Sequence, residues 1–431
     1  MNVFDRLSAD IENIEMRVSE TAQLKKLMRL FFLGQIVGLP TLHSILNRFE
    51  IKSNNEQIKY KKLCKSLSNN KIHAIFEFVF ERQVEEELKL LSNKDASNWS
   101  REIVTAVLDD SVFKQWLQSQ DAYSAYEGCY KRSFSGQVGH AVYGFQVVTF
   151  GLSIEGMFYP LYFQSVKKKD EKKDEKKDEK KDEKKDEKKE ETDKSGKPTI
   201  EVAIQLVKKW GLFKERLSQR GIILPCINFS CDSGYSDVIL SEICSNKGLN
   251  YISVPKKNHC FIIQDIKIRL DEWVNHVFIV QEQKHIEGQK RVKEAQRVPF
   301  TYRFRAFYVS QNREVTLLAF RLNGSKKVSI IYTTDKNIKA KTLRRHWFQR
   351  TYIEQFFKLL KHYLKIQQTI TTTKHEFEVK LLRFAFIALH LQGLVKFMRR
   401  KIRAFKNKGF GTLRYLMQAD KDIINLLKQN I

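Results

Sequence analysis

The sequence predicts an α/β protein built on a mixed sheet, and three observations lead to this prediction. Short apolar runs typical of buried strands alternate with amphipathic helical stretches over residues 99–260 and again over 334–366. The intervening residues 261–333 are dominated by alternating, β-branched and aromatic runs, which predicts a β-rich insertion. Helical patterns fill residues 1–98 and 367–431, so we expect an all-α domain before the sheet domain and a helical region after it.

The N-terminal region contains two amphipathic stretches, Tyr60–Leu67 and Ile72–Leu91, joined by a polar turn. Lysines lie on or beside both stretches, so the pair could be a helix-turn-helix DNA reader. Helical pairs with lysines are also common without that function. At the other end, Glu378–Met398 predicts a long amphipathic helix, for which core packing is the simplest use.

Two aspartates follow apolar strands of the predicted sheet. Ile103–Leu108 runs into Asp109, and Ile222–Phe229 is followed closely by Asp232. Carboxylates at the carboxyl ends of neighbouring parallel strands are a recurrent ligand geometry in α/β folds. A strand-terminal aspartate can equally form a turn or cap a helix.

Further strands and helices separate and follow these aspartates. A hairpin is expected between them, turning at Gly151. The expected strands are Gln137–Phe150, Leu152–Phe163, Tyr251–Val254, Val277–Val280, Tyr302–Val309, Val315–Leu322 and Val328–Tyr332, and the expected helices are Thr199–Gln219 and Ser236–Asn246.

Residues 347–361 have the pattern of one amphipathic helix. At about 3.6 residues per turn, Trp347, Arg350, Glu354 and Lys361 fall on one face, with apolar residues opposite. A helix that presents Arg, Glu and Lys suits a site that handles phosphate. A surface helix with salt-bridging charges would have the same pattern.

Charge and length narrow the class of protein. The 431 residues are enough for two or three domains. Lys and Arg number 77 against 50 Asp and Glu, a net charge of +27. A DEKK repeat makes 167–197 a charged low-complexity loop. Within it, residues 167–191 hold 13 lysines and 12 acidic residues, so the rest of the chain keeps +26. Such an excess favours a polyanion, either a nucleic acid or an anionic membrane.

Three classes of feature are missing from the sequence. No apolar run reaches the roughly 18 residues of a membrane helix, and the N-terminus has no secretory-signal pattern. The six cysteines lack the spacing of zinc ligands. We therefore expect a cytoplasmic protein with reduced thiols and no membrane partner.

The order of the elements is that of the ribonuclease H-like fold, and the motifs point to one family. The chain resembles the bacterial insertion-sequence DDE transposases of the insertion-sequence-four family. The family signature, Tyr-x₂-Arg-x₃-Glu-x₆-Lys, is matched as Trp347-x₂-Arg350-x₃-Glu354-x₆-Lys361. Trp347 departs from the signature tyrosine, and the charged tract is a second departure.

Two upstream segments extend the resemblance. The family's Asp-x-[Ser/Thr] segment after the first strand is matched by Asp109-Asp110-Ser111, which makes Asp109 the better candidate and Asp110 its neighbour. The family's Asp-x-x-Tyr segment is matched by Asp232-Ser233-Gly234-Tyr235. The match covers roughly residues 100–400.

The resemblance implies an Mg²⁺-dependent enzyme that moves an insertion sequence by cut-and-paste transposition. Asp109, Asp232 and Glu354 would be the catalytic residues and the ligands of two Mg²⁺ ions, which Mn²⁺ can replace. The expected DNA-binding residues are Trp347, Arg350, Lys361 and Tyr235. The expected partners are double-stranded DNA, at the element ends and the target, and a second copy of the chain in a homodimer. The expected location is the bacterial cytoplasm, at the nucleoid.

Two other interpretations remain open. The chain could be a decayed or domesticated copy that binds DNA without cleaving it, which Trp347 and the charged tract favour. It could also be a ribonuclease H-like nuclease or resolvase without strand transfer. In relatives an insertion aromatic holds a flipped base, and spacing does not distinguish that residue from sheet core. The candidates are Trp273, Tyr302, Phe304, Phe307 and Tyr308.

Overall fold

The computed structural model describes most of the chain between residues 71 and 401. The described stretches are 71–92, 104–114, 129–135, 140–167, 197–256, 258–289, 300–321, 327–368 and 373–401, together with Ala22, Lys25 and Met28. The Tyr60–Leu67 stretch, the charged tract from residue 168 to 196 and everything after 401 lie outside the described residues. Predictions that concern those segments remain predictions.

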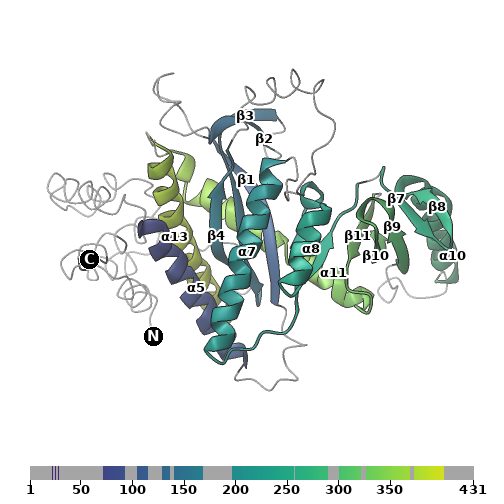
Figure 1. The fold of residues 1–431 in the computed structure, drawn as a ribbon, viewed down its shortest axis with the longest axis horizontal. Helices are drawn as coiled ribbons and strands as arrows, with labels where there is room; N and C mark the ends of the chain where they lie inside the picture. Colours follow the sequence, from purple (N-terminus) through teal and green to yellow (C-terminus); the bar gives the residue numbers. More distant parts are fainter. Residues whose placement is uncertain are drawn as a thin grey trace, which may run out of the picture.

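A mixed sheet organises the structure, as the sequence predicted (Figure 1). The strand order is β2-β3-β1-β5-β6-β11-β10-β9-β7-β8, with β4 paired to β3. Strands β1, β5 and β6 run parallel, whereas β3 is antiparallel to β1 and β4 is antiparallel to β3. The strands of this half are β1 (Val104–Lys114), β2 (Tyr130–Ser135), β3 (His140–Ile154), β4 (Met157–Ser165), β5 (Ile227–Cys231) and β6 (Leu249–Ser253).

The β3–β4 hairpin turns at Glu155 and Gly156, so the expectation of a turn at Gly151 was wrong. Both turn residues have positive φ, 49° and 80°, as a two-residue turn matched to strand twist requires. Gly151 lies inside β3 beside a register shift. A side chain there would collide with the Tyr159 carbonyl oxygen of β4. The glycine therefore allows close strand approach rather than reversal of the chain.

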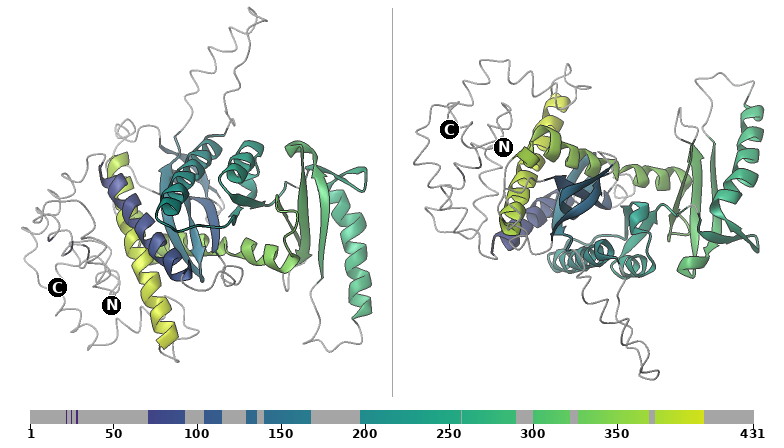
Figure 2. Two further views of the ribbon diagram at one scale, coloured as in Figure 1. Left: turned by 60° about the horizontal axis from the view of Figure 1, so that its bottom comes forward. Right: turned by 90° about the horizontal axis from the view of Figure 1, so that it is seen from above.

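Helices cover both faces of this half of the sheet (Figures 1 and 2). One side carries α5 (Lys71–Ser92) and α13 (Lys374–Lys401), and the other carries α7 (Pro198–Gln219) and α8 (Val238–Asn246). The core consists mainly of Leu, Ile, Val and Phe side chains from these helices and from β1, β3 and β4. Burial of both strand faces accounts for the nearly continuous apolar runs in the sequence.

Helix α5 packs on the sheet domain. It confirms the helix expected over Ile72–Leu91, and its apolar residues join the main core. Its acidic residues face α7 in three ion pairs, each 2.6 Å long: Glu77–Lys209, Glu81–Arg216 and Glu85–Arg220. Acidic positions four residues apart on α5 thus align with basic positions on α7.

The region predicted as a β-rich insertion is largely strand, but it also contains a helical segment. Its strands are β7 (Cys260–Ile263), β8 (Ile266–Arg269), β9 (Thr301–Tyr308), β10 (Arg313–Arg321) and β11 (Val328–Thr333). Strand β11 pairs with β6, so the insertion continues the sheet of the first half.

The strand expected over Val277–Val280 was wrong. The first two of these residues end a π-turn, Val274–Phe278, which follows α9 (Leu270–Trp273), and the last two begin α10 (Ile279–Gly288). Phe278 and Trp273 are buried against Ala319 of β10. Tertiary packing of one apolar face outweighs the strand preference of the β-branched residues.

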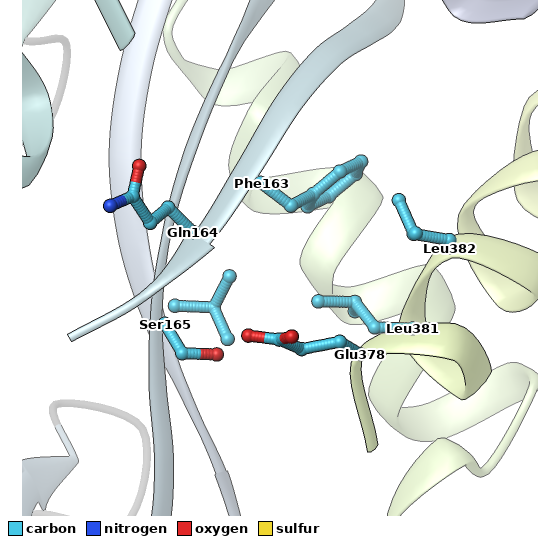
Figure 3. Close-up of a pocket in the computed structure, with 7 residues that line it drawn as sticks. Phe163, Gln164, Ser165, Glu378, Leu381 and Leu382 are labelled. Atoms are coloured by element: carbon cyan, nitrogen blue, oxygen red, sulfur yellow. The ribbon is translucent and has the colours of Figure 1, made fainter. Parts of the chain in front are cut away.

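A small cavity lies between β4 and α13, which otherwise pack on each other (Figure 3). Its volume of about 10 Å³ would hold a single water molecule. Glu378 points from α13 toward Ser165 of β4 across this space (Figure 3). Within the described part of the chain, no helix combines the length and apolar character needed to cross a membrane.

Candidate active site

Asp109 and Asp232 lie at neighbouring strand positions. β1 pairs with β5 in parallel up to Leu108 and Cys231, and each aspartate is the next residue. We expected the strand to end at Asp109, and this was wrong. β1 continues to Lys114, paired with β3. Asp109 therefore stands where the parallel pairing ends, and this brings it near Asp232.

The segment after β5 is held by hydrogen bonds from β6. Asp232 caps a short 3₁₀ turn, Ser233–Tyr235, by accepting from the Ser233 amide. The Ser253 hydroxyl donates to the Asp232 carbonyl oxygen at 3.0 Å, and the Tyr251 hydroxyl donates to the Tyr235 carbonyl oxygen. The backbone that carries Asp232 is thereby fixed on the edge of the sheet.

Tyr235, which the sequence predicted as a DNA contact, is buried in this structure. Its side chain is 2% exposed, and its hydroxyl donates to Asp110 Oδ1 at 2.8 Å. Gln146 donates to the other oxygen of Asp110 at 2.7 Å. Burial and the charges of Asp110 and Asp109 raise the pKa of the Tyr235 hydroxyl, so it stays a donor. Tyr235 thus orients Asp110 from inside the fold.

Arg350 joins two of the predicted carboxylates. Its Nη1 lies 3.3 Å from Asp109 Oδ2, and its Nη2 lies 2.8 Å from Glu354 Oε1. Trp347 packs below it, with the guanidinium carbon 5.1 Å from the ring centroid. Trp347 also packs on the apolar cluster that includes Ile252. The tryptophan is therefore a platform for Arg350 in this structure.

The helix expected over residues 347–361 is divided. α11 (Ala340–Phe348) ends before Arg350, and α12 (Thr351–Lys358) begins after it. The amides of Gln349 and Arg350 donate to carbonyls three residues back, which tightens the backbone at the junction. The buried Gln349 side chain accepts from the Ser153 hydroxyl at 2.9 Å and anchors the junction to β3. Sequence periodicity carries no signal for this break.

Lys361 lies near Asp109 and Asp110, on a π-turn, Leu359–Tyr363, that follows α12. Its ammonium lies 5.3 Å from the centroid of the Phe113 ring. Burial lowers the pKa of Lys361 to about 8, while the negative charges of Asp110 and Asp109 act in the opposite direction. The π-turn adds a residue to one turn, which changes where Lys361 points relative to Glu354.

Among the carboxyl groups of this site, Asp109 has the pKa that is shifted furthest from its ordinary value. Burial raises its pKa to about 7, and Arg350 opposes that shift, while the nearby charges of Asp110 and Asp232 add to it. Its side chain is 13% exposed, against 48% for Glu354. A buried carboxylate with two further negative charges nearby is a position where a bound cation would be favourable.

The donor chemistry of Asp109, Asp232 and Glu354 fits Mg²⁺, which prefers a few carboxylate oxygens. Their present spacing is wider than a metal site needs. In the described stretches, no three acidic, histidine or cysteine side chains are close enough together to hold a metal ion. Arg350 lies between Asp109 and Glu354 and contacts both.

Two side chains that the sequence did not single out hold the helices of this site against the sheet. His346 Nδ1 lies 2.7 Å from the Thr105 hydroxyl of β1, and Gln349 contacts Ser153 as described above. Trp273, one of the candidate aromatics for a flipped base, is 3% exposed and stacks on Phe304 at 4.3 Å. It belongs to the core of the insertion.

A scan against models of known protein families finds no match to this chain, and a search of curated proteins finds no relative.

Proposed function

We propose that this protein is an Mg²⁺-dependent DNA transposase of the insertion-sequence DDE type, with Asp109, Asp232 and Glu354 as its catalytic carboxylates. The observation that carries the proposal is the contact of Arg350 with both Asp109 and Glu354. Two acids 245 positions apart in the sequence share one guanidinium, and Asp232 is near enough to act on the pKa of Asp109.

The arrangement of the sheet supports a ribonuclease H-like fold. The chain runs from the strand with Asp109 through the three antiparallel strands β2, β3 and β4 and helix α7 to the parallel strand that precedes Asp232. A helix and a further parallel strand follow, and Glu354 comes late, on α12. This is the order that we expected from the sequence, with one further strand, β2, at the edge of the sheet.

The side chains divide into metal ligands and phosphate ligands. Asp109, Asp232 and Glu354 would hold the metal, which supplies activation of the attacking oxygen and neutralises charge on the scissile phosphate. Arg350 and Lys361 carry the positive charges of the site, and Arg350 can bind a phosphate through two parallel N–H groups. Phosphate binding would draw Arg350 away from Asp109 and Glu354 and free their oxygens.

A DNA cleavage assay tests this function. Its substrate is a labelled duplex with the sequence of one end of the DNA element that carries the gene. With Mg²⁺ we expect nicking at the element end, followed by hairpin and joined products, and we expect no cleavage in EDTA. Glu354→Gln should cleave at least about a thousandfold more slowly, because loss of several kcal/mol of charge stabilisation has that effect. Its affinity for the duplex should stay within about twofold of wild type.

The matched control is Glu215→Gln, which removes an exposed carboxylate from α7 and should cleave normally. Unchanged cleavage by Glu354→Gln would refute the assignment. Binding without cleavage by the wild-type protein would instead support a decayed DNA-binding copy. Trp347, which stands where the family signature has tyrosine, favours this second candidate.

A further inference from the structure

Strand β9 carries two exposed arginines on one face. Exposed and partly buried residues alternate over the first five residues of β9, and Arg303 and Arg305 are among the exposed ones. Alternate residues of a strand point to the same face and lie about 6.6 Å apart. The intervening Tyr302 and Phe304 point the other way, toward Trp273.

The face with these arginines is the one on which α11 packs. Arg303 is paired with Leu318 of β10, so their side chains share a face. Leu318 clusters with Leu343 of α11, whereas its neighbour Ala319 clusters with Trp273 on the other face. Figure 2 shows α11 on one side of the insertion strands and α10 on the opposite side.

Basic side chains continue from β9 along the loop before α11 and along α11 itself. Arg303 Nη2 donates to the Lys336 carbonyl oxygen at 2.8 Å, which places the strand beside this loop. We call the exposed basic set the basic tract, and its members are Arg303, Arg305, Lys336, Lys339, Lys341 and Arg345. Lys341 and Arg345 are four residues apart and so lie on one stripe of α11.

Acidic residues only partly neutralise the basic tract. Glu314 pairs with Lys336 at 2.5 Å, and Asp335 lies next to Lys336 in the chain. Six basic residues against these two leave a net charge of +4. α11 spans nine residues, or about 14 Å, and Arg350 follows two residues after its end. The basic tract and the carboxylate site are therefore within one duplex turn of each other, about 34 Å.

We propose that the basic tract binds the phosphate backbone of duplex DNA outside the cleaved position. The proposal rests on the function proposed above, because it takes duplex DNA as the substrate. The basic tract would be a second surface of the protein that contacts this DNA, beside the carboxylate site. Exposed arginines at strand spacing, with no aromatic side chain between them on that face, suit backbone contact rather than base stacking. The tract supplies affinity through counterion release and has no sequence preference of its own.

Binding of a fluorescent duplex by the full-length protein in EDTA, across a range of salt concentrations, tests this surface. Arg303→Gln together with Arg305→Gln should weaken binding roughly tenfold at physiological salt and reduce the slope of log K against log[salt] by up to about 1.8. The charge-conserving pair Arg303→Lys with Arg305→Lys should keep most of the affinity and the slope.

The matched control is Lys208→Gln with Lys284→Gln, which removes two exposed positive charges from α7 and α10. If this control weakened binding as much as the arginine pair, the basic tract would be refuted and the proposed function would stand. If the protein bound a duplex RNA of the same sequence more tightly than the duplex DNA, the proposal that the basic tract binds DNA would also be refuted. A wild-type protein that bound no duplex DNA would overturn both proposals.

Discussion

Asp109 and Asp110 are adjacent, yet their side chains serve different parts of the structure. Asp109 contacts Arg350 beside α12, whereas Asp110 accepts from Tyr235 and Gln146. The alternation of a strand explains the difference, because successive side chains point to opposite faces. The sequence favoured Asp109 only through a family motif. Neither the partners of Asp110 nor the burial of Tyr235 could be predicted, since both depend on segments distant in the chain.

The raised pKa of Asp109, about 7, predicts how its replacement changes stability. The native state binds this proton more tightly than the unfolded chain, whose aspartates titrate near 3.9. Stability is therefore lost as pH rises through the native pKa. In EDTA, the wild type should lose roughly 1–3 kcal/mol more unfolding free energy than Asp109→Asn between pH 5 and pH 8. Urea unfolding measures this, and an equal loss in both proteins would show that Asp109 titrates normally.

At the scale of elements, the pattern of residues 347–361 correctly placed Arg350 and Glu354 near each other, but not on one continuous helix. The break depends on Gln349, a polar residue that is buried because Ser153 of β3 offers it a hydroxyl. A helical wheel shows only residues of the helix itself, so it could not have indicated Ser153 as the partner of Gln349. The helical segment within the insertion was missed for a similar reason, since Phe278 is buried by β10 rather than by its sequence neighbours.

His346 fastens α11 to β1 and makes this contact dependent on pH. Burial, with a smaller effect from Arg345, lowers the pKa of His346 to about 4. Below about pH 6.5 the His346 imidazole becomes protonated in the unfolded chain but stays neutral in the native state. The free energy of unfolding therefore falls as pH decreases toward 4. Between pH 7 and pH 5 the wild type should lose about 2 kcal/mol more than His346→Gln. Thermal or urea unfolding at both pH values gives the comparison, and parallel losses would contradict it.

At the scale of the whole molecule, the order of strands and helices around the two aspartates could be predicted from the sequence. The pairing of β11 with β6, which makes the insertion part of one sheet, could not. The excess of positive charge was evident from composition, but its gathering on β9 and α11 depends on the fold. Arg303 and Arg345 are 42 residues apart in the sequence, and the packing of α11 on β10 brings their elements together.

The most direct test of the central claim compares two neighbouring positions in one cleavage assay. Single-turnover rates with Mg²⁺ should fall at least about a thousandfold for Asp109→Asn, which removes a proposed metal ligand. Asp110→Asn keeps one of the two oxygens that accept from Tyr235 and Gln146 and leaves the proposed metal ligands in place, so its rate should stay within about tenfold of wild type. If Asp109→Asn cleaved at the wild-type rate, or if Asp110→Asn alone lost activity, the proposed catalytic site would be contradicted.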